Sequence, residues 1–267
     1  MQQPICENPT LEKLRDVWKD PYQKLKIRDL YRLKSKKNEV YLLSLIDTPF
    51  QKYDKVILKK YHTRSPMLEV NLLSKLYSTN LVPKLLLDAK EFVVLEYIEG
   101  QNLCDVLNST LDLKYAQMLA EWFANFHQAL PATNEVVTLK GDAHLRNFIV
   151  RDGRCYGLDF EESYVGSFVN DIAQAAGSIF DTHPGIEDPL FFPAKLMLVS
   201  KFLKTYIDLR HNELVIKELK EQFIPTFIRI LKETADRRGY WDNIVIANSL
   251  QALFKKFVDK EIDLFNL

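Results

Sequence analysis

The chain has 267 residues, of which 47% are hydrophobic, and its 36 Lys and Arg balance its 36 Asp and Glu. This composition predicts a sizeable core in one large domain or two lobes, and the zero net charge gives no sign of a nucleic-acid-binding tail. Cys6, Cys104 and Cys155 form no Cys-x-x-Cys pair, which indicates ordinary thiols in a reducing compartment. Because neither a signal peptide nor a run of ~20 apolar residues is evident, we expect a cytoplasmic protein without membrane or nucleic-acid partners.

The first part of the chain predicts an antiparallel sheet with one helix. Apolar runs separated by polar turns favour strands over residues 26–32, 40–46, 56–58, 85–87 and 92–97. Ser65 and Pro66 suit the start of a helix, since serine can cap a helix and proline fits its first position. The leucines of Leu68–Leu76 then follow at helical spacing.

Beyond Gly100 the pattern becomes mostly helical. An amphipathic helix is predicted over Leu113–Leu130, and residues 170–181 and most of 190–265 also have helical character. Breaks in these helices are expected near Pro184, Pro189, Pro193, Pro225 and Gly239. Asp152 and Gly153 predict a tight turn between two short strands at 148–150 and 156–158. The chain is therefore expected to be an α+β protein whose two parts divide near residues 98–101.

Three side chains in residues 139–161 carry the main chemical signal. Asn147 follows Asp142 by five residues, and Asp159 comes after the predicted hairpin. Phosphoryl transfer from ATP needs a carboxylate to orient the attacking hydroxyl and oxygen ligands to hold Mg²⁺ on the phosphates. Each residue alone also suits a turn or a cap, but a lone carboxylate after an apolar strand is costly to bury. The three together favour a site for ATP and Mg²⁺.

Six segments, taken together, resemble the motifs of one enzyme superfamily. They are Val56–Lys59, Leu95–Gly100, Leu119–His127, Gly141–Asn147, Leu158–Glu161 and Asp171–Ala173. With them the chain resembles the aminoglycoside phosphotransferase and choline kinase superfamily. The resemblance implies a bilobal protein-kinase-like fold, with a small antiparallel-sheet N-lobe containing one helix (1–98) and a larger, mostly helical C-lobe (99–267). The N-lobe would cover the nucleotide, and the C-lobe would carry the catalytic loop, the metal site and the acceptor-binding part.

The resemblance also implies roles for residues of the C-lobe. Asp142 would accept or orient the proton of the substrate hydroxyl, and Asn147 and Asp159 would bind Mg²⁺. Asp171 is expected to hold the catalytic loop in place rather than touch substrate. His127 lies on an otherwise apolar helix, so we expect a buried core histidine.

Three positions near the catalytic loop need separate comment. His144 takes a place where small-molecule kinases of this superfamily often carry His, and we expect it to brace the loop. Lys140 stands where many relatives have His, at a position that is usually structural. Glu161 replaces the Gly of Asp-Phe-Gly, either as a second metal ligand or as an acid that faces the substrate.

In the N-lobe, Lys59 would neutralise the α- and β-phosphates, and Glu69 would pair with it. Lys60 is the alternative to Lys59, because a shift of one residue along a strand exchanges its two faces. Glu69 is also a favourable acid near a helix N-terminus, so its residue type alone does not decide between the two roles.

Nucleotide contacts are also implied for Glu96 and Ile98, whose backbone groups would hydrogen-bond the adenine. The first glycine of the chain is Gly100, so no Gly-rich phosphate loop lies between the first two strands. Any cover for the phosphates there would come from Ser35 and the backbone of residues 36–38.

The resemblance predicts transfer of the γ-phosphate of ATP to a hydroxyl of a small molecule that is aminoglycoside-, choline- or sugar-like. The acidic stretch of residues 151–190, which includes Glu161, Glu162, Asp181, Glu187 and Asp188, favours a cationic acceptor. Asp171 follows Asp159 by only 12 positions, which leaves little room for a segment that docks a protein substrate. The alternatives are a compact atypical serine/threonine protein kinase and a non-catalytic nucleotide-binding module.

Overall fold

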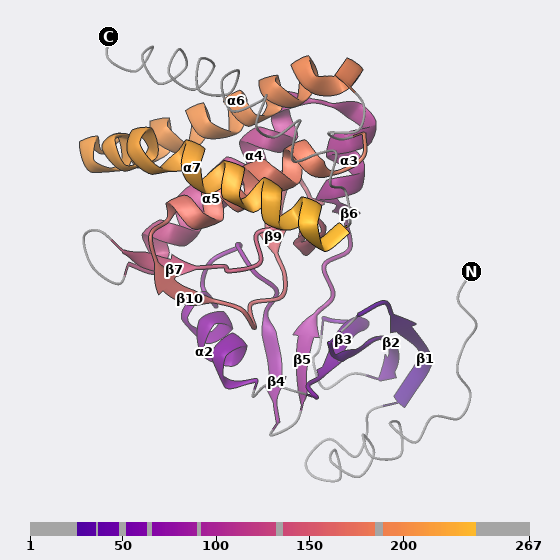
Figure 1. The fold of residues 1–267 in the computed structure, drawn as a ribbon. Helices are drawn as coiled ribbons and strands as arrows, with labels where there is room; N and C mark the ends of the chain where they lie inside the picture. Colours follow the sequence, from indigo (N-terminus) through magenta and orange to yellow (C-terminus); the bar gives the residue numbers. More distant parts are fainter. Residues whose placement is uncertain are drawn as a thin grey trace. The chain divides into compact units, whose positions relative to one another are not determined.

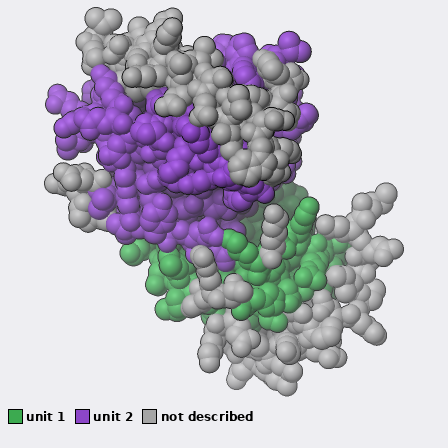
Figure 2. Space-filling view, in the orientation of Figure 1, with its two compact units in different colours: residues 1–99 green, residues 100–267 purple. Residues whose placement is uncertain are grey.

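The computed structural model describes residues 26–238, except for residues 36, 48–51, 63–65, 90–91, 132–135 and 185–188. The chain divides into two compact units, Met1–Glu99 and Gly100–Leu267. Figure 1 shows the helices and strands in chain order, and Figure 2 shows which residues belong to each unit. No helix in this described part is both long and apolar enough to cross a membrane.

The first unit is built on a five-stranded sheet in which every neighbouring pair of strands is antiparallel. In spatial order its strands are β1 (Lys26–Leu33), β2 (Glu39–Asp47), β3 (Lys55–Lys60), β5 (Phe92–Glu96) and β4 (Leu85–Asp88). Side chains alternate between the two faces of a strand. A buried apolar cluster that includes Leu43, Val56, Leu58 and Val94 therefore lies on the face opposite Lys59. The five strands predicted from the sequence are confirmed.

The helix predicted in the first unit is α2 (Met67–Lys75), although its start differs from the expectation. Pro66 occupies the N-cap position without a side-chain cap bond, and Ser65 lies outside the described residues. Leu68 is 50% exposed, so the buried stripe of α2 begins one residue later, at Glu69. This places a carboxylate among buried apolar side chains.

Helices dominate the described part of the second unit. They are α3 (Leu103–Thr110), α4 (Leu113–Ala129), α5 (Val169–Asp181), α6 (Phe192–Arg210) and α7 (Glu213–Arg238). In Figure 1, α5 and α7 run alongside each other, and the contacts between helices pair α4 with α6 and α5 with both α6 and α7. The short 3₁₀ turns η1 (Leu145–Asn147) and η2 (Pro189–Phe191) complete the helical part.

Two small antiparallel sheets accompany these helices. One contains β6 (Gln101–Asn102), β8 (Phe148–Arg151) and β9 (Arg154–Gly157), and the other pairs β7 (Val137–Leu139) with β10 (Tyr164–Gly166). Asp152 and Gly153 join β8 to β9 with φ angles of 51° and 71°. Because a type I′ hairpin turn requires positive φ at both central residues, this confirms the predicted turn.

The sequence missed α3 and placed a helix break wrongly at Pro225. Proline lies inside α7, where it removes one backbone hydrogen bond. Phe223 and Phe227 on either side of it are both fully buried. Burying two such side chains stabilises the helix by roughly 3–6 kcal/mol, which offsets the ~3 kcal/mol that an interior proline costs. The break expected near Gly239 lies outside the described residues.

A buried polar network connects three helices at the centre of the second unit. His127 of α4 is fully buried; its Nδ1 lies 2.9 Å from the Tyr206 hydroxyl of α6, and its Nε2 lies 3.2 Å from Asp171 Oδ2 of α5. Burial lowers the pKa of the His127 imidazole, although the Asp171 carboxylate acts in the opposite direction. The expectation of a core histidine is confirmed.

This network predicts a pH-dependent stability. Since the pKa of folded His127 lies below its ordinary value of 6.5, acid protonates this residue more readily in the unfolded chain. We expect the free energy of unfolding to fall as the pH drops below about 6.5, and His127→Gln to reduce this dependence. Denaturant titrations at pH 7.5 and 5.5 measure it.

His183→Gln is the matched control, because His183 is an exposed histidine of the same unit. It should retain the full pH dependence of the unmodified chain. If His127→Gln and His183→Gln show the same change between pH 7.5 and 5.5, burial of His127 is not the cause.

Candidate active site

The loop that follows β7 is held by polar side chains of α5. The Asp171 carboxylate, which is 1% exposed, accepts hydrogen bonds from the backbone N–H of Lys140 at 2.7 Å and of Gly141 at 3.1 Å. Further along the loop, Gln174 accepts from the Ala143 N–H at 2.7 Å, and Ser178 accepts from the Leu145 N–H at 3.0 Å. The expectation that Asp171 ties down this loop is confirmed.

Asp142 and Asn147 are joined within the loop. The Asn147 side-chain nitrogen donates to the Asp142 carbonyl oxygen at 3.1 Å, and the Asn147 carbonyl accepts from the Leu158 N–H at 2.8 Å. The side-chain amide nitrogen of Asn147 is thus used inside the loop. The bond to Leu158 also brings the loop beside the segment that carries Asp159.

Asp159 follows β9 with a φ of 61°, in the left-handed region that residues other than glycine seldom adopt. Asp is among the residues that tolerate this conformation best, yet it still costs free energy that the surroundings must offset. The Lys140 ammonium donates to the Asp159 carbonyl at 3.0 Å and to the Asp142 carbonyl at 2.8 Å. One nitrogen atom therefore connects the backbone at Asp142 with the backbone at Asp159.

The residues directly after Asn147 and Asp159 are both anchored in one aromatic cluster. Phe148 and Phe160 are fully buried, and their ring centroids lie 5.0 Å and 6.3 Å from that of Trp122 in α4. A buried aromatic side chain resists displacement because its packing is close and its burial is worth several kcal/mol. The two anchors fix the chain immediately beside Asn147 and Asp159.

Asn147 and Asp159 carry the kind of oxygen ligands that magnesium prefers. In the described part of the chain, no three His, Cys, Asp or Glu side chains gather into a metal cluster. Magnesium in phosphoryl-transfer enzymes is typically held by one or two protein oxygens together with substrate phosphates and water. Asp159 supplies a carboxylate, and Asn147 supplies an amide oxygen whose nitrogen is already bonded within the loop.

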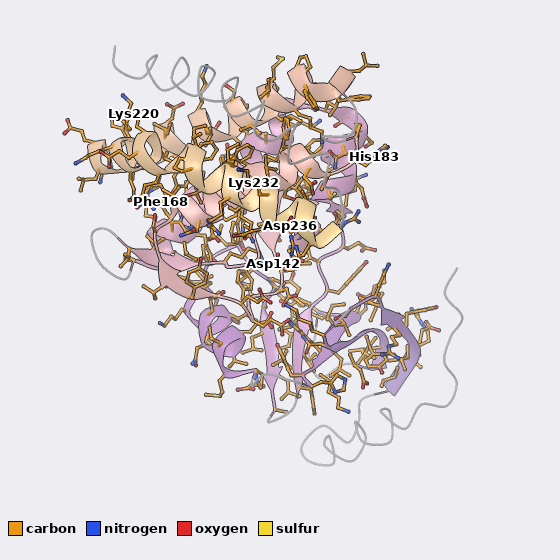
Figure 3. The ribbon with its side chains drawn as sticks, viewed as in Figure 1. Asp142, Phe168, His183, Lys220, Lys232 and Asp236 are labelled. Carbon is orange, nitrogen blue, oxygen red and sulfur yellow. The ribbon has the colours of Figure 1, made fainter. Side chains whose placement is uncertain are left out.

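A cavity of about 420 Å³ in the second unit opens beside this loop. Its carboxylates come from three segments: Asp142 of the loop, Asp181 of α5, and Glu233 and Asp236 of α7. Arg237 is the cation among the residues that line it. Figure 3 labels Asp142 and Asp236, which both line this cavity. The cavity is therefore acidic and contains the predicted catalytic residue.

His144 also lines the cavity, while its Nδ1 accepts a hydrogen bond from the Arg146 N–H at 3.2 Å and so caps η1.

The sequence analysis expected the acidic residues of 151–190 to face a cationic acceptor. Of these, Asp181 lines the cavity, and Glu187 and Asp188 lie outside the described residues. Glu161 is 6% exposed, which shields it from solvent. The contribution of α7 was missed, because its charge pattern resembles that of any solvated helix.

The first unit contains the ion pair predicted from the sequence. Lys59 Nζ lies 2.7 Å from Glu69 Oε2, and both side chains are almost fully buried. The same Glu69 oxygen accepts a hydrogen bond from the Tyr61 hydroxyl at 2.5 Å. Tyr61 had not been singled out, although its place two residues after Lys59 would put both on one face of an extended chain. Lys60 takes the opposite face and is partly exposed.

The other residues assigned to the nucleotide also lie in the first unit. The Glu96 N–H donates to the Lys84 carbonyl at 2.9 Å. A backbone contact between Glu96 and the adenine base would therefore use the Glu96 carbonyl oxygen. Ile98 is buried and follows β5 outside the strand ladder. Ser35 is exposed, and its hydroxyl accepts from the Asn38 N–H at 3.2 Å, which closes the turn between β1 and β2.

Comparison with protein families gives a match over residues 78–194 to the phosphotransferase enzyme family. This range contains Asp142, Asn147 and Asp159 but neither Lys59 nor α7. No curated protein sequence matches the chain. The family match therefore includes the loop and the segment that carries Asp159.

Solved structures share the fold at low sequence identity. An amicoumacin kinase in complex with AMP-PNP, Ca²⁺ and Ami has a TM-score of 0.63 and 15% identity, over 95% of this chain and 94% of that chain. A choline/ethanolamine kinase family protein from Mesorhizobium loti has a TM-score of 0.59 and 13% identity, over 96% and 99%. The aminoglycoside phosphotransferase APH(2")-IIa, with streptomycin and ATP, has a TM-score of 0.57 and 14% identity, over 87% and 90%.

The five-stranded antiparallel sheet and the helical second unit agree with this likeness, so the predicted α+β, protein-kinase-like fold is confirmed. The phosphotransferase enzyme family thus matches less than half of the chain, and the solved structures share its fold.

Proposed function

We propose that this protein transfers the γ-phosphate of ATP, with Mg²⁺, to a hydroxyl group of a small cationic molecule. One observation carries the proposal: Asp142 lines an acidic cavity, and the ammonium that bonds its carbonyl also bonds the carbonyl of Asp159. A carboxylate that faces an acceptor cavity is thus tied to a carboxylate suited to a metal. Phosphoryl transfer requires both groups in one site.

In this reaction Asp142 orients the acceptor hydroxyl and takes its proton. Asp159 and Asn147 hold Mg²⁺ through their side-chain oxygens, and the bound ion would neutralise charge on the phosphates. Lys59, held by Glu69, interacts with the α- and β-phosphates, while Ser35, Glu96 and Ile98 contact the nucleotide. The first unit then serves mainly for the nucleotide, and the second carries the catalytic loop and the acceptor.

The acceptor class follows from the size and charge of the cavity. A volume of about 420 Å³ suits a small molecule rather than a folded protein segment. Four carboxylates against one guanidinium favour a ligand with one or more ammonium groups. Amino sugars and amino alcohols carry both an ammonium and a hydroxyl, and the fold is shared with kinases named for such compounds.

A screen of ADP release tests the function. With Mg²⁺-ATP, we expect turnover with at least one member of a panel of amino alcohols, amino sugars and aminoglycosides. Asp142→Ala should lower this turnover by about 10²–10⁴-fold, the usual contribution of a general base. Mg²⁺-ATP should still raise the melting temperature of this variant, because Asp142 is not assigned to the nucleotide.

Full turnover in Asp142→Ala would contradict the proposal. Labelled phosphate that reaches only protein would instead support a compact protein kinase. If Mg²⁺-ATP does not raise the melting temperature of the unmodified chain, the small-molecule kinase, the protein kinase and the nucleotide-binding module are all rejected.

The assignment of Lys59 predicts a contrast between two adjacent lysines. Lys59→Met should weaken ATP binding by about tenfold or more, since a charge-assisted hydrogen bond contributes ~1.5–3 kcal/mol. Lys60→Met removes a lysine from the other face of β3 and should leave ATP binding within about twofold. Titration calorimetry with AMP-PNP measures both. A larger effect at Lys60 would reverse the assignment.

The acidic cavity predicts that Asp236→Asn raises the KM of a cationic acceptor by about two- to fivefold, because an exposed ion pair contributes roughly 0.2–1 kcal/mol. The KM for ATP should not change. Asp208→Asn, which removes an exposed aspartate of α6 that does not line the cavity, is the control. Steady-state kinetics at low ionic strength measure the shift, and equal KM values in the two variants would exclude a role for Asp236.

A further inference from the structure

Lys140 is a lysine in the interior of the second unit whose charge serves no step of the proposed reaction directly. Its side chain has no exposed surface, and its ammonium lies 5.5 Å and 5.1 Å from the ring centroids of Phe148 and Phe160. Burying an ammonium costs several kcal/mol unless hydrogen bonds and nearby negative charge density offset the loss of water. A position that needed only packing would be filled more favourably by an apolar side chain.

The hydrogen bonds of Lys140 explain why a charged donor is placed there. Its ammonium donates to the carbonyl of Asp142 at 2.8 Å and to the carbonyl of Asp159 at 3.0 Å. Its own N–H donates to Asp171, and its carbonyl accepts from the Ser163 hydroxyl at 3.2 Å. The backbone of Lys140 is therefore fixed, so its side chain acts from a rigid base.

The bond to Asp159 matters most, because the backbone of that residue is in a conformation of low intrinsic stability. Its φ of 61° sets the direction of its side chain. Side-chain direction is coupled to the backbone, so a return to negative φ would turn the carboxylate to another side. A charge-assisted bond to the carbonyl of the same residue favours the observed conformation.

We propose that Lys140 is a positioning residue that holds the Asp159 carboxylate in the direction required for the metal and couples it to the catalytic loop at Asp142. The inference rests on the proposed function, and it concerns how this chain keeps a metal ligand oriented. Partners that orient metal ligands typically contribute 10–100-fold to metal affinity. Lys140 is expected to act within that range.

The test compares two buried lysines. Lys140→Met keeps most of the length of the side chain and removes its donors. Lys195→Met does the same to a fully buried lysine that bonds the carbonyls of Ile179 and Thr182, both at 2.9 Å, away from the loop. Binding of AMP-PNP is measured by calorimetry with and without Mg²⁺, and stability is measured by denaturant titration.

We expect Lys140→Met to weaken Mg²⁺-dependent AMP-PNP binding about 10–100-fold while metal-free binding changes less than threefold. Lys195→Met should lose stability but leave both affinities within threefold. Lys140→Gln, which keeps an uncharged NH2 donor group, should fall between Lys140→Met and the unmodified chain.

An unchanged Mg²⁺-dependent affinity in Lys140→Met would overturn the inference and leave the proposed function intact. Absence of Mg²⁺-nucleotide binding in the unmodified chain would reject the proposed function itself. If both Lys140 variants fail to fold under conditions where Lys195→Met folds, Lys140 is a folding residue and the inference is wrong.

Discussion

The buried carboxylate of Asp171 is the constraint on which the second unit depends. It accepts hydrogen bonds from two consecutive backbone N–H groups of the loop, at Lys140 and Gly141, and it lies beside His127. A buried charge of this kind is tolerable only when its oxygens are satisfied, so helix α5, helix α4 and the loop must keep their relative positions. Contacts in the buried core therefore set the direction of the loop that carries Asp142.

The loop is also bonded to the segment that carries Asp159. Lys140 connects the two backbones through one ammonium, and Asn147 bonds both Asp142 and Leu158. Phe148 and Phe160 bury their rings beside Trp122, so polar contacts and apolar packing act on the same short segments. Such preorganisation agrees with the proposed phosphoryl transfer, in which fixed groups stabilise developing charge without rearranging.

In the first unit, a buried lysine is likewise held by neighbouring polar side chains. Lys59 is almost fully buried, so its ammonium needs a partner that offsets the loss of water. Lys59 and Tyr61 both donate to the same carboxylate oxygen of Glu69, and the tyrosine bond restrains the carboxylate. The chain has no glycine before Gly100, and the turn between β1 and β2 is closed by the Ser35 hydroxyl.

Much of this protein can be predicted from its sequence. The five strands of the first unit, α2, α4, α5 and the turn at Asp152 and Gly153 follow from local periodicity and turn chemistry, which depend on neighbouring residues. The spacing of Asp142, Asn147 and Asp159 predicted phosphoryl transfer, and the match to the phosphotransferase enzyme family agrees with it. What the tertiary structure alone decided are contacts between distant segments: the ammonium of Lys140 on two carbonyls, Tyr61 on Glu69, and the acidic wall that α7 adds to the cavity. Pro225 shows the reason, since burial of Phe223 and Phe227 in the packed core outweighs a local signal that by itself predicts a break.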